Sequence, residues 1–430
     1  MAFLAALLAA CLVGANYLLH RDVMYPGFLQ AALWFTVFAL LWLTEGMFAP
    51  VSDRTLIILV AGVALFSMGA FVASYGHVPH LARNHLRDGT LPSIWAISLL
   101  AVLAAWGLIL YARRAQELAA AGPFDQPFIN LRYAVSIVPD ETGGFGITQY
   151  FLGPAYVLAA IMILKRHGLA TPAVPRLVAG VTLMIALAFG ILSSGRGPVL
   201  TLIIVVLAIP TVLRARTPAR TATILVALSL VLFAVVGLAL GKGGSLGSTL
   251  RENSATMRES FLTYVLAPIP SLSTFLDNRG PEVDVGVNSL RSVFAVLHAL
   301  GFHATVAPVV QPYVDVPMLS NVYTVHQPYI KDFGILGGGV ALFVLGFLHS
   351  LLYRRATIRN PHAIYVFLFA LSLFPLIMQG FQDMYFTLLS MWLQFVTYAV
   401  LFFGILSEGQ FKTLLTKARS NGLPPFGSGA

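Results

Sequence analysis

The chain is poor in charge and holds a single cysteine. Only 10% of its 430 residues are charged, whereas 58% are hydrophobic. Soluble domains carry about 25% charged residues, so an ordinary water-soluble globular protein is excluded. The lone Cys11 cannot form an intramolecular disulfide, which excludes a disulfide scaffold. The formal net charge is +9, but the basic residues form no compact run, and we expect no nucleic-acid partner.

Long apolar stretches recur along almost the whole chain. A helix of about 20 apolar residues crosses a bilayer, and in lipid every backbone polar group must be paired within the fold. The sequence therefore predicts an all-α polytopic membrane protein with about 11 (10–12) transmembrane helices. The expected spans are 3–19, 28–44, 55–75, 92–112, 148–165, 175–193, 198–213, 221–240, 333–353, 363–380 and 384–405.

The connections between these spans are short, with two exceptions. One is the segment 113–147 and the other is a large extracytoplasmic loop, 241–331. We predict one transmembrane domain over residues 1–430, with 410–430 as a short cytoplasmic tail. Within the loop, 250–266 and 290–302 place apolar residues at helical spacing on one face. These two stretches predict short amphipathic helices that fold back over the bundle.

Basic residues fall in every second connection, which orients the chain. Connections rich in lysine and arginine face the cytoplasm. The other side then receives 113–147, the turn at Arg196 and the loop 241–331. The basic positions on the cytoplasmic side are Arg21, Arg83, Arg87, Lys165, Arg166, Arg214, Arg216, Arg220, Arg354, Arg355, Arg359, Lys412, Lys417 and Arg419.

Arg196 stands between two apolar runs in the stretch ILSSGRGPVLTLII. A guanidinium in lipid is costly, so Arg196 must lie at a water-facing turn, in a polar cavity or in an ion pair. Arginine offers a planar set of donors that matches phosphate, and Gly195 and Gly197 would let the backbone approach a ligand. The alternative is a tight turn whose arginine extends to the lipid headgroups. Other extracytoplasmic arginines are Arg132, Arg251, Arg258, Arg279 and Arg291.

Metal and nucleotide motifs are missing from the sequence. His298 and His303 are five residues apart, which does not match the i, i+4 spacing of helical metal ligands. The phosphate-loop pattern does not occur, and the match to the serine-hydrolase pattern G-x-S-x-G at Gly243–Gly247 lies in a glycine-rich stretch that we interpret as a flexible exit from a span. We therefore expect no metal and no cofactor.

The segment Asn321–Ser350, NVYTVHQPYIKDFGILGGGVALFVLGFLHS, gathers polar and aromatic residues just before a span. Its pattern N-x-Y-T, then Y-x-x-D-F-G-x-x-G, then an apolar helix, resembles the bacterial oligosaccharide repeat-unit polymerases, the Wzy-type O-antigen polymerases. The S-x-R-G turn at Arg196, the stretch INLRYAVS around Arg132 and the long late loop are also similar to that family. The similarity covers most of 110–400, through short motifs. An odd number of spans departs from the even number usual in the family.

The resemblance implies a metal-independent glycosyltransferase in the bacterial inner membrane, with its active site facing the periplasm. It would transfer the growing glycan from polyprenyl pyrophosphate onto a new lipid-linked repeat unit. Its partners would be the polyprenyl-pyrophosphate-linked oligosaccharides, the lipid bilayer and a chain-length regulator protein. The surface polysaccharide would be an O-antigen or a related polymer.

The residue types fit such chemistry. Departure of a pyrophosphate develops negative charge, which fixed guanidinium groups stabilise; Arg196 and Arg132 are the first candidates. An acceptor hydroxyl needs a base, for which His326 or Asp332 is suitable. The remaining candidates for binding the substrate are Arg291, Arg258, Arg279, Asn321, Tyr323, Thr324 and Tyr329.

Simpler roles stay open for the same residues. Asp332 suits a helix cap, since a carboxylate at a helix start accepts backbone N–H groups. His326 could be an interfacial loop residue without a role. Arg132 could form a structural ion pair with Asp125 or Asp140.

Two other functions compete with the polymerase. A transporter or flippase of lipid-linked glycan predicts charged residues within the spans, and the spans here are nearly free of charge. An O-antigen ligase uses the same reaction class with another acceptor. Ligases usually carry a His-Asn pair in the late outer loop, where this chain has His326 followed by Gln327.

Overall fold

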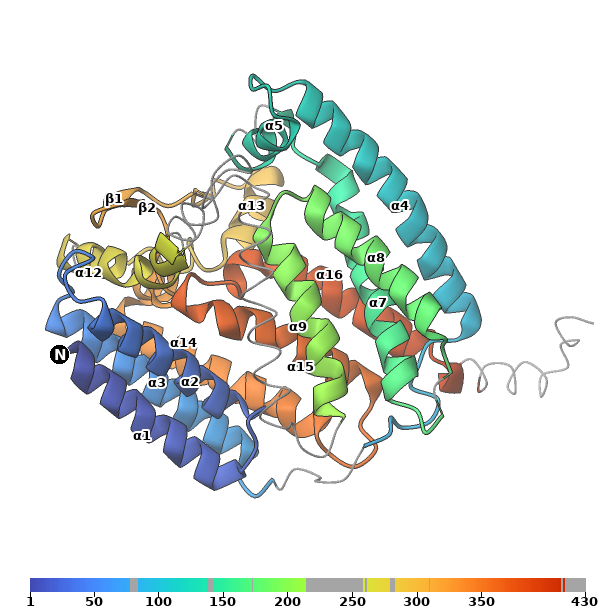
Figure 1. Ribbon diagram of the computed structural model, residues 1–430, viewed down its shortest axis with the longest axis horizontal. Helices are drawn as coiled ribbons and strands as arrows, with labels where there is room; N and C mark the ends of the chain where they lie inside the picture. Colours follow the sequence, from blue (N-terminus) through green and yellow to red (C-terminus); the bar gives the residue numbers. More distant parts are fainter. Residues whose placement is uncertain are drawn as a thin grey trace, which may run out of the picture. The chain divides into compact units, whose positions relative to one another are not determined.

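The computed structural model describes most of the chain, and the regular secondary structure of the described residues is almost entirely helical (Figure 1). They contain a single short antiparallel sheet, in which β1 (Val314–Asp315) pairs with β2 (Leu319–Ser320). The expected span 221–240 lies outside the described residues, as do Arg83, Arg214, Arg216, Arg220, Arg251, Arg279, Lys412, Lys417, Arg419 and Asp140. The described residues are 1–77, 84–137, 142–171, 173–213, 258–259, 261–278, 283–308, 310–410 and 413.

Eight described helical segments are long and apolar enough to cross a membrane, and two shorter helices are apolar as well. The chain is therefore an all-α, multi-pass membrane protein, as the composition predicts. Five of the eight are single helices: α1 (Ala2–His20), α2 (Pro26–Leu43), α3 (Asp53–Ser74), α4 (Ile94–Ala120) and α14 (His326–Ala356). The other three combine consecutive pieces: η2 (Gly146–Phe151) with α7 (Leu152–His167), α15 (Ala363–Ile377) with η3 (Met378–Gly380), and η4 (Phe386–Leu388) with α16 (Leu389–Ala399) and η5 (Val400–Ile405). The two shorter apolar helices are α8 (Arg176–Leu192) and α9 (Arg196–Val212).

The predicted spans within the described ranges match these helices, with differences at two of them. Helix α4 runs to Ala120, eight residues beyond the expected end, because Arg113–Ala120 continues with good helix formers. Helix α14 begins at His326, seven residues before the expected start. The extra residues form a separate helical piece, which is the core of the site described below.

Short helices also occur between the spans. The predicted amphipathic helix 290–302 is α13 (Arg291–Ala299), which buries none of its residues. Of the predicted helix 250–266, residues 258–259 and 261–266 are described, and they are helical. Two further short helices, α5 (Pro127–Arg132) and α12 (Pro268–Asn278), were not expected from the sequence. The hydroxyl of Ser273 on α12 accepts a hydrogen bond from the Ser52 N–H at the start of α3 (2.9 Å).

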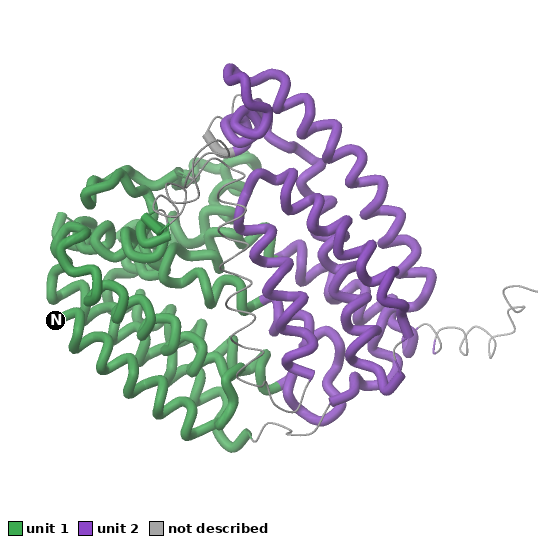
Figure 2. Tube along the Cα trace, viewed as in Figure 1, with its two compact units in different colours: residues 1–79, 216–354, 372–392 green, residues 80–215, 355–371, 393–430 purple. Residues whose placement is uncertain are grey.

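The chain divides into two compact units, which are described separately (Figure 2). Unit 1 comprises Met1–Pro79, Arg216–Arg354 and Ser372–Trp392, and unit 2 comprises His80–Ala215, Arg355–Leu371 and Leu393–Ala430. Each unit is thus assembled from stretches far apart in the sequence. The single transmembrane domain over 1–430 stays a prediction.

In unit 1 the helices α3 and α14 approach each other closely at glycines. A Cβ atom on Gly69 would collide with the backbone oxygen of Phe343, and one on Gly346 with the backbone oxygen of Phe66. Small residues that let helix backbones meet are typical of membrane helix pairs, because packing drives their association. These two glycines therefore fix the position of α14 against α3.

In unit 2 the basic connections meet at one end of the helices. The Leu86 N–H donates to the Gly168 carbonyl (2.7 Å), and the Arg87 N–H donates to the Pro361 carbonyl (3.0 Å). The ammonium of Lys165 pairs with Glu408 at 3.3 Å. The positive-inside rule predicts that such an end faces the cytoplasm, and the assignment of sides stays a prediction.

Candidate functional site

Helix α14 is broken near its start, and the break makes a hairpin. Gly334 has φ 73° and ψ 179°, a conformation that only glycine adopts readily. A Cβ on Gly338 would lie 2.9 Å from Ile330 Cγ1, although residues eight apart in a continuous helix are about 12 Å apart. Residues 326–333 therefore fold back on the long span. We call residues 326–342 the α14 hairpin.

His326 begins this hairpin and is buried among α2 and α3. Its side chain is 2% exposed, and its ring lies edge-on to Trp34, with 5.6 Å between centroids. The hydroxyl of Thr324 is 3.2 Å from Nδ1 of His326. A Cβ on Gly62 of α3 would collide with Nε2 of His326, so a small residue at position 62 makes the room. His326 is helical and enclosed, so it is not a loop residue, and its role stays a prediction.

Asp332 lies at the tip of the hairpin and anchors the chain that precedes α13. Its buried carboxylate accepts hydrogen bonds from Asn288 through N–H (3.0 Å) and Nδ2 (2.7 Å). It also accepts from Ser289 through N–H and Oγ, both at 2.6 Å. The donors come from this connecting segment and not from the start of its own helix. Asp332 is thus an anchor for the loop, which differs from the simple helix cap considered from the sequence.

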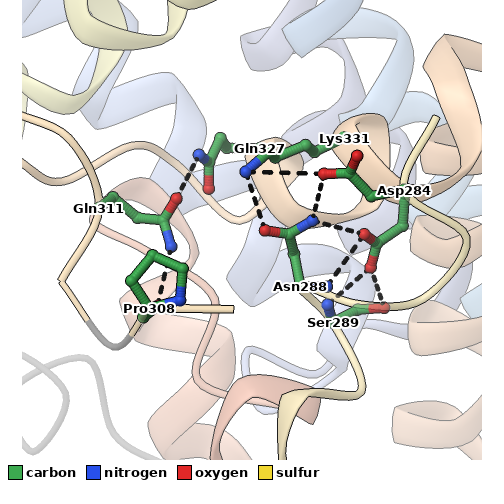
Figure 3. Close-up of polar contacts among 8 residues, drawn as sticks. Asp284, Asn288, Ser289, Pro308, Gln311, Gln327 and Lys331 are labelled. Atoms are coloured by element: carbon green, nitrogen blue, oxygen red, sulfur yellow. Dashed lines mark hydrogen bonds and ion pairs between the residues drawn. The ribbon is translucent and has the colours of Figure 1, made fainter. Parts of the chain in front are cut away.

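A second polar group surrounds this anchor at the tip (Figure 3). The ammonium of Lys331 lies 3.0 Å from Asn288 Oδ1 and 3.6 Å from a carboxylate oxygen of Asp284. Farther along the same face, Gln327 Nε2 donates to Gln311 Oε1 at 3.0 Å. No local sequence pattern singles out these residues, since their partners are 16 to 47 positions away.

Tyr329 connects the hairpin to the turn that follows η3. Its hydroxyl donates a 2.7 Å hydrogen bond to Asp383, which is buried. The same carboxylate accepts the N–H groups of Tyr385 (3.2 Å) and Thr387 (2.9 Å). Burial raises the pKa of Asp383, and the hydrogen bonds from Thr387, Tyr329 and Tyr385 oppose that effect. The polar turn around Asp383 is therefore tied to the hairpin.

A chain of hydrogen bonds runs through the interior of unit 1. Gln30 Nε2 donates to Gln379 Oε1 (3.2 Å), and Gln379 Nε2 donates to the hydroxyl of Tyr385 (2.9 Å). That hydroxyl lies 2.9 Å from Nε2 of His349, whose Nδ1 is 3.2 Å from Ser372 Oγ. Sequence reasoning missed His349, although a histidine in an apolar span is itself a signal.

The other predicted substrate ligands in unit 1 differ in their surroundings. Tyr323 is buried, and its hydroxyl donates to the Pro312 carbonyl (2.8 Å). Burial raises the pKa of Tyr323. Arg291 is half-buried and donates through Nε to the Ala307 carbonyl (2.7 Å). Asn321 is half-buried, and Arg258 is exposed.

Arg132 and Arg196 belong to unit 2. Arg132 ends α5 and is half-buried, and among the described residues no ion pair joins it to Asp125. Arg196 is the first residue of α9, its guanidinium nitrogens are shielded from solvent, and its side chain has an interaction partner. The left-handed residue of this turn is Ser194 (φ 53°), whereas Gly195 has φ −105°. The tight turn is thus present, but the conformational freedom of Gly195 is not what makes it.

The segment 113–147 is held by an arginine that sequence reasoning missed. Arg114 donates to the carbonyls of Thr142 (2.7 Å) and Gly144 (3.0 Å). Gly143 and Gly144 both have positive φ, which bends the chain back toward α4. Arg114 therefore has a structural role in this segment.

The fold and the buried polar groups define a multi-pass α-helical membrane protein with a polar hairpin inside one of its units. Compared with known proteins, the chain matches no family model, no curated protein and no solved structure.

Proposed function

We propose that this protein is a membrane glycosyltransferase that polymerises lipid-linked oligosaccharide repeat units. A hydroxyl at the non-reducing end of a new repeat unit would attack the anomeric carbon of the growing glycan. A carbon–oxygen bond forms, the bond to the pyrophosphate breaks, and the hydroxyl proton goes to a base. Polyprenyl pyrophosphate leaves.

The α14 hairpin is the observation that carries this proposal. It brings His326, Tyr329 and Asp332 into unit 1 through one broken helix. Polar residues inside a membrane bundle are costly and mark functional sites. The motif that resembles the polymerase family, Y-x-x-D-F-G-x-x-G, spans the tip of this hairpin.

The residues of the hairpin and of the chain 284–311 that contacts it have the chemistry that a phosphorylated sugar needs. Lys331 and Arg291 supply cations, and Gln327 and Gln311 supply amide groups for sugar hydroxyls. The 2.7 Å bond from Arg291 to Ala307 orients its guanidinium. Removal of one such stabilising donor costs about 3 kcal/mol of barrier in other enzymes. The residues proposed to help hold the glycan are Arg258, Asn321, Tyr323 and Thr324.

His326 and Asp332 receive different roles in the proposal. The carboxylate of Asp332 accepts four hydrogen bonds from Asn288 and Ser289, so we assign Asp332 the role of a positioning residue. His326 keeps the role of base, for which the acceptor hydroxyl must reach the hairpin interior.

The remaining parts of the proposal rest on the resemblance of the sequence motifs. Arg132 and Arg196 are proposed as pyrophosphate ligands, since their motifs are similar to those of the polymerase family. We place the protein in the bacterial inner membrane, with the site on the periplasmic side. A chain-length regulator protein is its proposed partner.

The test is a gel of surface glycolipid from a strain that lacks the gene. A core with one repeat unit and no longer ladder supports a polymerase. The strain is then complemented with Arg291→Ala, His326→Gln and Arg196→Lys, each at normal protein level. We expect shorter or absent ladders from these variants. The control is Arg176→Ala, which should keep the ladder, because Arg176 begins α8 and the turn before Arg196 follows the other end of that helix. An intact ladder in the deletion strain would overturn the proposal.

A transporter of lipid-linked glycan is the second candidate, and one observation favours it. His349 lies inside a span and is linked through Tyr385 and Gln379 to Gln30 on α2. Buried titratable groups within spans are typical of transport pathways. A core without any repeat unit in the same gel would favour this function or the ligase over the polymerase.

A further inference from the structure

Three buried polar atoms around the start of the α14 hairpin have no hydrogen-bond partner among the described residues. They are Gln30 Oε1, Trp34 Nε1 and His326 Nε2. The side chains of Gln30 and Trp34 are 0% exposed, and that of His326 is 2% exposed. A buried polar group without a partner is destabilising, so each such atom in a native protein requires an explanation.

The three side chains belong to α2 and to the α14 hairpin, and Trp34 neighbours both of the others. Gln30 and Trp34 are one turn apart on the same face of α2, and the Trp34 ring lies 5.6 Å from the His326 ring. Leu59 and Val63 of α3 belong to the same core cluster as Trp34, so the indole has apolar neighbours. Trp34 thus links Gln30 and His326 within an enclosed part of unit 1, in which Gln379 and Thr324 are the nearby polar groups.

The three atoms together offer one hydrogen-bond donor, one acceptor and one group that can act as either. An indole N–H can only donate, and an amide oxygen can only accept. The free imidazole nitrogen donates or accepts according to its tautomer. A neutral hydroxyl group combines a donor with acceptors, and a buried water typically makes about three hydrogen bonds. An ion fits less well, because none of the three atoms carries a full charge when the histidine is neutral.

We infer that Gln30, Trp34 and His326 form an internal binding site for a neutral hydroxyl group. The hydroxyl oxygen accepts from Trp34 Nε1, donates to Gln30 Oε1 and bonds to His326 Nε2. The occupant is an enclosed water molecule or the hydroxyl of a larger molecule. The inference rests on the buried atoms and not on the proposed function.

The bound hydroxyl would lengthen the chain of hydrogen bonds in unit 1. That chain runs from Ser372 through His349, Tyr385 and Gln379 to Gln30. A hydroxyl at the new site joins its end at Gln30 to the α14 hairpin at His326.

The first test is an experimental map of the full-length protein at a resolution that shows ordered water. We expect density within hydrogen-bond distance of all three atoms. An isolated peak identifies water, and density that continues into a larger molecule identifies a ligand hydroxyl. Absence of density at this place, with neighbouring ordered waters visible, would overturn the inference.

The second test is the Trp34→Phe variant, which removes the donor and keeps an aromatic ring. If a hydroxyl is bound, the variant loses a hydrogen bond, and the thermal midpoint in detergent falls by about 2 °C or more. If the site is empty, the variant loses only buried volume, and its midpoint falls no further than that of Phe38→Leu, which removes volume from an equally buried position on α2. Trp95→Phe is the matched control, since Trp95 is 73% exposed. The map on the unmodified protein keeps the inference testable if Trp34→Phe does not fold.

Discussion

The Tyr329 hydroxyl donates a 2.7 Å hydrogen bond to Asp383 across 54 positions of the sequence. This bond joins the α14 hairpin to the turn between η3 and η4. We expect Tyr329→Phe to destabilise the protein by about 1–3 kcal/mol, because a buried carboxylate loses a donor. Thermal unfolding in detergent measures the loss, and Tyr313→Phe is the control, since Tyr313 is 61% exposed. Equal midpoints for the two variants would show that the bond contributes nothing.

Asp383 should make the stability depend on pH. Burial raises its pKa, so between its ordinary and its raised pKa the folded state keeps a proton that the unfolded state has released. The free energy of unfolding therefore falls as the pH rises through that window. Asp383→Asn should remove this part of the pH dependence. Thermal midpoints of both proteins across the window check it, and parallel curves would contradict it.

Replacement of Asp332 should release the segment before α13. Asp332→Ala leaves the donors of Asn288 and Ser289 unpaired in a buried place, with an expected cost of about 3 kcal/mol. Limited proteolysis should then cut within 283–308 faster than in the unmodified protein. Glu117→Gln is the control, because its side chain is 64% exposed and its pairing with Arg114 is worth little. An unchanged cleavage rate in Asp332→Ala would contradict the anchoring role.

The hairpin should depend on two glycines for different reasons. Gly334→Ala places a side chain at φ 73°, with open space around it, so its cost of about 1–3 kcal/mol is purely conformational. Gly338→Ala instead brings a methyl group 2.9 Å from Ile330. Both should lower the thermal midpoint, whereas Gly14→Ala on α1 meets nothing within 4 Å and should leave it unchanged or raise it. Midpoints that do not separate Gly334→Ala from Gly14→Ala would refute the hairpin.

The interior chain of hydrogen bonds should respond to Tyr385→Phe. The variant leaves His349 Nε2 and Gln379 Nε2 without the hydroxyl that both contact at 2.9 Å. We expect a loss of about 2 kcal/mol, measured by chemical or thermal unfolding. Restoring Tyr385 in the same background must recover the midpoint. A variant as stable as the unmodified protein would show that the hydroxyl is dispensable.

Composition and hydropathy predicted the fold class and most spans, because backbone polar groups in lipid must be hydrogen-bonded within the fold, which long apolar helices achieve. The short amphipathic helix α13 was predicted as well, from the apolar spacing around Phe294. The hairpin could not be derived in this way. The run Gly337–Gly339 marks a helix that opens on glycines, but the fold-back depends on contacts with Ile330 and on the space left by Gly62.

The candidate site, like the fold, could be predicted from the sequence only in part. His326, Tyr329 and Asp332 stood out because polar residues before an apolar span are conspicuous in the sequence. The partners of Asp332 did not, since pairing over 43 and 44 positions leaves no local pattern. The backbone of the turn before Arg196 could not be predicted either. Ser194 takes the left-handed conformation there, although the neighbouring Gly195 would be expected to do so.

The close approach of α3 and α14 has a consequence for mutational scanning. At Gly69 and Gly346 even one methyl group collides with the backbone of the other helix. Both positions will therefore reject every other amino acid, although neither carries a functional group. A scan that ranks residues by intolerance alone would place them beside the residues of the candidate site, and only an assay that measures folding separately from function would distinguish the two kinds of position.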